Sequence, residues 1–98
     1  MTNYIGKKVI VRGIESGVYF GTLADMDGRT VELTKCRNIW YWRGAANLFQ
    51  MAVDGIKNIE ESKISMEVDS VIFTDICEIV PCSEKAIACI EGAKPWKV

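Results

Sequence analysis

A β-hairpin is predicted by residues 18–34, which read VYFGTLADMDGRTVELT. The Asp27-Gly28 pair is typical of a two-residue hairpin turn, because glycine accepts the positive φ that such turns require. Val31 and Leu33 alternate with polar residues, which indicates a returning strand with one buried face. Gly21 interrupts the first strand, so we expect a bulge or a sharp bend there.

Outward from this hairpin, the sequence predicts more strands and two short helices. The β-branched residues 8–12 predict a strand before it, and the aromatic residues 38–42 continue or resume the strand after it. Alternation in 64–68 and β-rich runs at 71–74 and 76–80 predict the rest of a sheet, which ends at Pro81. A helix is expected over residues 45–54, with Gly55 after its end. A second helix is expected over 84–91, with Ser83 as its N-cap and Gly92 after it.

These elements predict a mainly β fold with two short helices, of the α+β class, in a single domain over residues 1–98. Short strands in so small a chain favour a strongly bent small barrel. Hydrophobic residues make up 49% of the chain and charged residues 26%, as in folded globular proteins. No apolar run is long enough for a membrane span, and the first residues lack a signal peptide, so we expect a cytoplasmic protein.

Charge and composition restrict the chemistry. Histidine is absent, which excludes Ser-His-Asp and Cys-His catalysis within one chain. Residues 1–44 hold seven basic and four acidic side chains, whereas residues 45–98 hold five and nine. This balance argues against a wholly basic nucleic-acid binder. It is compatible with a local anion site in the first half, or with charge pairing between subunits.

Other polar and sulfur-containing residues are assigned structural roles. The cysteines form no C-x-x-C pair, so we expect small buried hydrophobes and no disulfide, metal or cofactor. The carboxylates at 25 and 27 are expected to cap the hairpin turn. The carboxylates of Asp69, Asp75 and Glu78 are expected to face solvent. The four cysteines are Cys36, Cys77, Cys82 and Cys89.

The candidate binding residues gather between Arg37 and Arg43, a segment that reads RNIWYWR. In an extended strand, Arg37, Tyr41 and Arg43 would share one face, and Trp40 and Trp42 the other. Guanidinium groups bind phosphate and aromatic faces stack on bases, so a nucleotide could use both kinds of contact. The same rings could instead fill a core or a subunit interface. Arg12 joins the candidate set if its strand pairs nearby.

Part of the hairpin is similar to the first signature of Sm-like proteins. Residues 21–27 (GTLADMD) and 31–33 (VEL) carry this likeness, and Ile76-x-x-Ile79 is similar to the second signature. The resemblance implies a five-stranded SH3-like barrel that is able to form rings.

A second resemblance spans most of the chain. Residues 11–12, 17–23, 79–82 and above all 37–46, which contain the pattern Arg-x-x-Trp-Tyr-Trp-x-Gly-Ala, resemble a family of small phage and prophage proteins of unknown function. This resemblance implies a viral origin and residence in the host cytoplasm. It implies no reaction and no site residues.

We therefore expect a non-catalytic phage accessory protein that binds a small anionic ligand, such as a nucleotide signal of host antiviral defence. The expected ligand-binding residues are Arg12, Arg37, Trp40, Tyr41, Trp42 and Arg43. One alternative is a homo-oligomeric or protein-interaction module that acts on a host or phage protein. Another is a small barrel that binds single-stranded nucleic acid. An enzyme is not expected.

Overall fold

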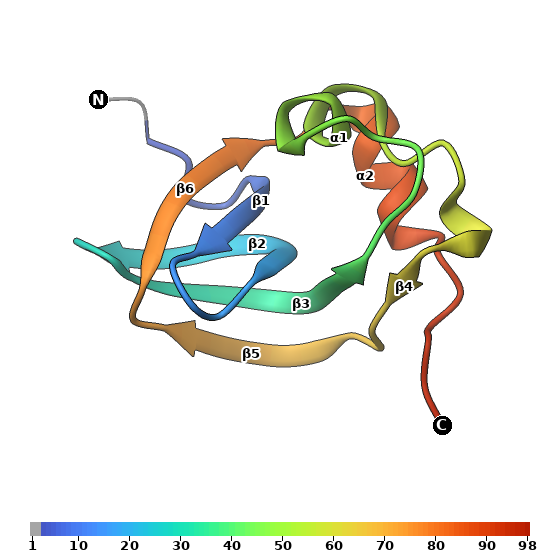
Figure 1. The fold of residues 1–98 in the computed structure, drawn as a ribbon. Coiled ribbons are helices and arrows are strands. Elements are labelled where there is room, and N and C mark those ends of the chain that lie inside the picture. The colour runs from blue at the N-terminus through green and yellow to red at the C-terminus, as the bar shows by residue number, and fades with distance from the viewer. Residues whose placement is uncertain (1–2) are drawn as a thin grey trace.

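The computed structural model describes residues 3–98 and contains one bent antiparallel sheet with two helices on one of its faces (Figure 1). The elements run in the order β1 (Lys8–Gly13), β2 (Val18–Asp27), β3 (Thr30–Tyr41), α1 (Leu48–Asp54), a 3-10 turn (Ile59–Glu61), β4 (Lys63–Ile64), β5 (Val68–Phe73), β6 (Ile76–Pro81) and α2 (Glu84–Glu91). The predicted mainly β fold with two short helices is confirmed.

The sheet has the order β4-β3-β2-β1-β6, and β5 also pairs with β3. β3 is long enough to pair with β5 along its first half and with β4 at its end. Within the described chain β5 and β6 do not pair with each other, although only residues 74 and 75 separate them. The sheet therefore has the curvature expected of a small barrel but remains open.

The sheet packs side chains from both of its faces into hydrophobic clusters, although the outer side of β5 is exposed. One face curls over an interior cluster, and the other is covered by α1 and α2 (Figure 1). Successive side chains of β1 point alternately into a cluster on each face, which explains why the run from Val9 to Val11 is entirely apolar. The interior cluster consists of Val9, Val11, Leu23, Val31, Leu33, Cys36, Phe73 and Ile76. The helix-side cluster consists of Ile10, Phe20, Ile39, Met51, Ala52, Ile56, Ile64, Ile90 and Ala93.

A bulge in the middle of β3 sets which side chains face the helices. The register between β2 and β3 shifts between Phe20 and Thr22, as expected at Gly21, whose added Cβ would lie 2.9 Å from the Thr34 carbonyl oxygen. Opposite the shift, Lys35 adopts a left-handed φ of 50°. The predicted strands over residues 29–34 and 38–42, which the sequence allowed to be separate, are therefore one bulged strand, Thr30–Tyr41. The extra residue in β3 reverses the alternation of side chains beyond it, so Arg37 lies on the helix-covered face.

The helices begin and end where local signals place them, with one exception. Ser83 caps α2 by accepting from the Ala86 amide, and Gly92 follows its last residue. α1 begins at Leu48 rather than at residue 45, because the Asn47 side chain accepts from the Gln50 amide and sets the first turn. Among residues 3–98, no helix is both long and apolar enough to cross a bilayer.

One acidic side chain predicted to face solvent has a structural role instead. Asp75, in the β5–β6 turn, accepts hydrogen bonds from the Glu15 amide at 2.7 Å, the Ser16 amide at 2.9 Å and the Ser16 hydroxyl at 2.8 Å. These hydrogen bonds favour the charged carboxylate and lower the pKa of Asp75 below its ordinary value of 3.8. The turn between β5 and β6 is thereby joined to the loop between β1 and β2.

Candidate functional site

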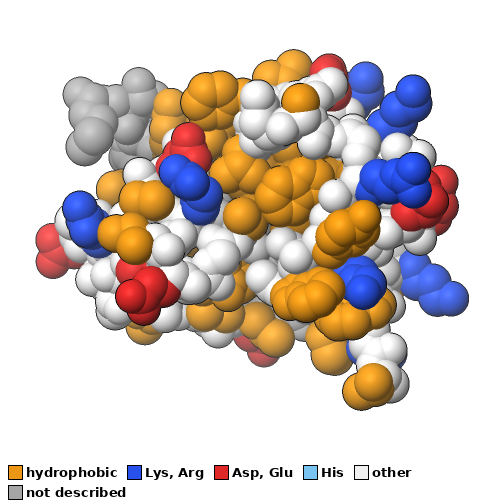
Figure 2. Space-filling model, in the orientation of Figure 1, with side chains coloured by type: hydrophobic (Ala, Val, Ile, Leu, Met, Phe, Trp, Pro, Cys, Tyr) orange, Lys and Arg blue, Asp and Glu red, His pale blue; other side chains and the backbone are white. Residues whose placement is uncertain are grey.

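The end of β3, β4 and the C-terminal segment together form an exposed aromatic surface. Trp40 and Tyr41 come from β3, Lys63 from β4, and Trp96 from the segment after α2. Figure 2 shows hydrophobic side chains grouped around a basic one over this part of the molecule. We call these four residues the stacking surface.

The two indoles of the stacking surface are stacked on each other. The ring centroids of Trp40 and Trp96 are 5.2 Å apart, and the rings are inclined by 18°. Both remain accessible, with 59% of Trp40 and 49% of Trp96 exposed. The stack is therefore open to a ligand that approaches from solvent.

A single ammonium group lies close to all three rings. The Lys63 Nζ is 4.9 Å from the centre of Trp40, 5.2 Å from that of Trp96 and 5.9 Å from that of Tyr41. These distances lie within the range of cation–π attraction, worth about 0.5–1 kcal/mol per exposed contact. The position of Lys63 follows from strand pairing, because it lies opposite Tyr41 in the β3–β4 register. The surface thus presents a cation and flat apolar rings side by side.

Arg43 borders the stacking surface. Its backbone amide donates to the Ser62 hydroxyl at 3.1 Å, and its guanidinium pairs with the Glu61 carboxylate at 3.2 Å. The pair is exposed, so water screens it and either group can exchange partners. Two further lysines, Lys94 and Lys97, flank Trp96 in the sequence and are exposed.

Arg37 lies elsewhere and has a different role from the one expected. It is only 4% exposed, and its guanidinium donates to carbonyl groups in two segments of backbone. Nε donates to the Ser65 carbonyl at 2.8 Å, Nη1 to that of Ile90 at 2.6 Å, and Nη2 to that of Ala93 at 2.9 Å. Desolvation lowers the pKa of Arg37, and the charge of Glu67 opposes that shift. The guanidinium therefore holds the C-terminal end of α2 against the sheet and faces no open surface.

The other two candidates are also separate from the stacking surface. Trp42 is half-buried against the helix-side cluster, and its Nε1 donates to the Ala45 carbonyl at 3.3 Å. Arg12 pairs with Glu78 of β6 at 3.2 Å and borders a hollow beside Phe49 of α1. The structure thus brings together Trp40 and Tyr41, with Arg43 adjacent.

Sequence reasoning did not assign Lys63 and Trp96 to the site. A tryptophan in a C-terminal tail is more typical of a packing anchor than of a site, and Lys63 follows a polar connection with no motif of its own. Their proximity arises from the pairing of β4 with the end of β3, and from the hydrogen bond between the Trp96 amide and the Ile64 carbonyl at 2.8 Å. No local pattern in the sequence signals either contact.

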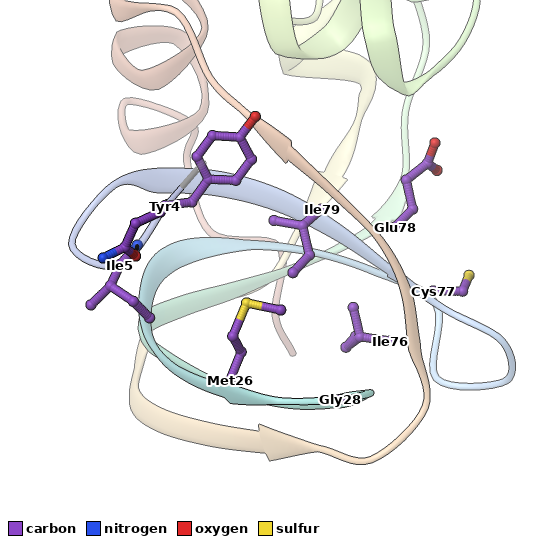
Figure 3. A pocket seen from close by; sticks show the side chains of 9 residues that line it. Tyr4, Ile5, Met26, Gly28, Ile76, Cys77, Glu78 and Ile79 are labelled. Atoms are coloured by element: carbon purple, nitrogen blue, oxygen red, sulfur yellow. Dashed lines mark hydrogen bonds between the residues drawn. The ribbon is translucent and has the colours of Figure 1, made fainter. Parts of the chain in front are cut away.

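Another hollow lies at the opposite end of the sheet and is mainly apolar. It measures about 500 Å³, between β6 and the β2–β3 turn. Figure 3 shows Met26, Ile76 and Ile79 directed toward the same space, whereas the Cys77 thiol points away from it. Glu78, the acidic group at its rim, is the carboxylate paired with Arg12. Among the described residues that line the hollow, the polar side chains include Asn3 and Tyr4 but no lysine or arginine, so the hollow does not favour an anionic ligand.

The thiols show no sign of metal or disulfide chemistry in the part of the chain described. All four cysteines are free, and no group of three metal-ligating side chains comes together within residues 3–98. Cys36 is buried as expected, but Cys77 is exposed, because it lies on the outer side of β6. Burial raises the pKa of Cys36 to about 11 and that of Cys82 to about 12.

Comparison with known proteins gives a family but no activity. No curated protein matches the sequence. A family model described as a domain of unknown function (DUF6948) matches residues 6–90, which is most of the chain. The matched region contains the whole sheet, α1 and nearly all of α2, whereas Trp96 lies beyond its end. The protein therefore belongs to the DUF6948 family of domains of unknown function.

Proposed function

We propose that this protein binds, without catalysis, an anionic ligand that carries nucleobases, and that the stacking surface is the site. The observation that supports this function is the position of the Lys63 ammonium within 6 Å of three exposed rings. A base needs a flat apolar face and a phosphate needs a cation, and here both are accessible together.

The shape of the site favours bases at the surface over a ligand enclosed in a pocket. The rings are open to solvent, and each base stacked on an aromatic face contributes about 1–3 kcal/mol. Lys94 and Lys97, close to Trp96 in the sequence, add positive charge, and Arg43 at the border is available when it exchanges Glu61 for a phosphate. A free nucleotide and a short single-stranded nucleic acid both combine bases with phosphate. A binding experiment distinguishes between these two ligands.

The absence of catalysis is part of the proposal. The sequence has no histidine, and the Lys63 ammonium at the site lies over aromatic rings. Such a surface can hold a ligand and sequester it, and the Glu61 carboxylate at its border is paired with Arg43.

The biological setting follows from the resemblance to small phage and prophage proteins. We place the protein in the cytoplasm of an infected host. There, sequestration of a nucleotide signal of antiviral defence is the role that fits a small non-catalytic binder. In that setting a free nucleotide, linear or cyclic, is the ligand to test first.

The test compares the wild type with Trp40→Ala and Lys63→Met by calorimetry. The ligands are a panel of linear and cyclic nucleotides and a fluorescein-labelled oligothymidylate. We expect binding by the wild type, at least about tenfold weaker binding by either variant, and weakening with salt in proportion to the phosphates neutralised. Lys85→Met is the matched control, because Lys85 is an exposed lysine on α2 that pairs with Asp54.

Each outcome has a defined meaning. Binding of mononucleotides alone identifies a free nucleotide as the ligand, and binding of the oligonucleotide alone identifies a single strand. If the wild type binds neither class at about millimolar ligand, or if Lys85→Met weakens binding as much as Lys63→Met, the proposed site is wrong.

The alternative function, assembly through a protein interface, is favoured by a different observation. β5 is an edge strand whose outer face carries Val68 and Ile72, and Ile72 is 65% exposed. Exposed apolar residues on an unpaired edge are typical of strand pairing between chains. Light scattering after gel filtration should then show an oligomer that Ile72→Lys converts to monomers. A wild-type monomer at about 100 µM would exclude this function.

A further inference from the structure

The C-terminal segment after α2 carries Trp96, and it folds back onto the other residues of the stacking surface, Trp40 and Lys63 among them. Residues 93–98 form no helix or strand, yet the Trp96 amide donates to the Ile64 carbonyl of β4 at 2.8 Å. This hydrogen bond brings the indole over Trp40, where the two rings stack. The tail is therefore a separate piece of chain that lies on the proposed binding site.

Trp96 has the geometry that a bound base would have. Its ring is nearly parallel to that of Trp40 at 5.2 Å, as in offset stacking. An indole is a fused two-ring system of about the size of a purine, so it covers a comparable area of Trp40. The Lys63 ammonium lies almost as close to the Trp96 ring as to the Trp40 ring, at 5.2 Å and 4.9 Å.

The tail is held by few contacts. Residues 94–98 are all exposed, and half of the Trp96 surface remains accessible to solvent. A hollow of about 370 Å³ runs beside the tail, lined in part by Lys94, Pro95 and Trp96 on one side and by Ile59 on the other. Arg37 binds the Ala93 carbonyl, so the core contacts end just before this segment. The tail can therefore leave the surface without disturbing the core.

We infer that the tail is a built-in competitor, in which Trp96 occupies the base-stacking position on Trp40 and must move away when a nucleobase binds. This inference rests on the proposed function, since it concerns the regulation of the same site. Its consequence is that the free protein has a weaker apparent affinity than the surface itself. If the docked tail outnumbers the undocked tail by about ten to one, removing it tightens binding about tenfold.

The experiment measures binding and tail docking separately. The variants are Trp96→Ala and a chain that ends after Lys94, which retains the Ala93 carbonyl needed by Arg37. The ligand is a fluorescein-labelled oligothymidylate, or the nucleotide that binds best to the wild type. Phe49→Ala is the matched control, because Phe49 is an aromatic side chain on α1 that is 63% exposed. Docking is followed by the exciton signal that stacked indoles give in far-UV circular dichroism.

We expect both tail variants to bind about tenfold more tightly, Phe49→Ala to bind as the wild type does, and saturating ligand to abolish the exciton signal of the wild type. Unchanged or weaker binding by the tail variants overturns the inference and leaves the proposed function intact, with Trp96 then a contributor to the site. If no variant binds, including the shortened chain, the proposed function fails and the inference fails with it.

Discussion

Replacing Arg37 with methionine is expected to destabilise the fold strongly, even though the new side chain has a similar length. The change removes the hydrogen bonds to the Ser65, Ile90 and Ala93 carbonyls, all between 2.6 and 2.9 Å. A hydrogen bond from a charged donor contributes about 1.5–3 kcal/mol, and a buried acceptor left without a partner costs about 1–3 kcal/mol. Desolvation of the guanidinium opposes part of this gain.

The net loss is expected to be about 3–5 kcal/mol, by analogy with the removal of one partner from a buried ionic contact. Domains of this size are stable by about 5–15 kcal/mol, so the variant would retain a small margin. Since each kcal/mol shifts the melting temperature of such a domain by about 4–8 °C, a fall of roughly 12 °C or more should be observed.

Urea unfolding followed by tryptophan fluorescence measures this loss. Arg37→Lys keeps the charge but not the forked donor geometry, so it should lie between the wild type and Arg37→Met. Arg43→Met is the control, because its exposed pair with Glu61 should contribute less than about 1 kcal/mol.

The structural role of Arg37 would be refuted by a specific result. If Arg37→Met unfolds within about 1 kcal/mol of the wild type and yet loses nucleotide binding, the guanidinium serves a ligand. The stabilising contacts with the end of α2 would then carry little free energy. If stability falls while the residual folded protein binds normally, the assignment made from the geometry is confirmed.

Three further outcomes are expected. Asp75→Asn should lower the free energy of unfolding at neutral pH and make it depend less on pH in acid. The Asp75 carboxylate has a lowered pKa in the folded state, so its stabilising contribution is complete above the unfolded pKa, near 3.8, and is lost as the pH falls through the folded pKa. Urea midpoints at several pH values measure this. At pH 8, iodoacetamide should label the exposed Cys77 first. Cys82, whose pKa is raised to about 12, should be labelled only when the protein unfolds, and peptide mass spectrometry distinguishes the two sites. Gly28→Ala should lower the free energy of unfolding by about 1 kcal/mol, because Gly28 has a positive φ and open space around it. Gly44→Ala should cost about 1–3 kcal/mol more, because the added Cβ would also lie 2.6 Å from a neighbouring side-chain oxygen. Equal shifts in melting temperature for the two variants would contradict this.

The parts of the fold that depend on neighbouring residues could be predicted from the sequence. The hairpin was predicted correctly, although its turn lies one residue later than expected, at Gly28-Arg29, with Asp27 paired to Thr30. This turn, the bend at Gly21 and the α2 helix between Ser83 and Gly92 all depend on contacts within a few residues. Their signals, such as a capping hydroxyl or a turn glycine, act locally and are visible in one sequence.

The site depended on contacts that are distant in the sequence. Arg37 was expected at a binding surface, but its acceptors lie 28 to 56 positions away, and the left-handed Lys35 that turns it inward carries no recognisable signal. Trp40 was assigned to the site from its own segment, whereas the partners that complete that site, Lys63 and Trp96, come from β4 and the tail.

The contact between Arg37 and the Ala93 carbonyl also fixes where the chain can be shortened. The match to the family model ends at residue 90, but the carbonyls of Glu91 and Ala93 that face the guanidinium lie beyond that limit. An expressed fragment cut at the family boundary would leave a buried cation short of acceptors, and we expect it to aggregate. A protease should instead trim the chain from its end and stop close to residue 93, so limited digestion reports the true boundary of the folded unit.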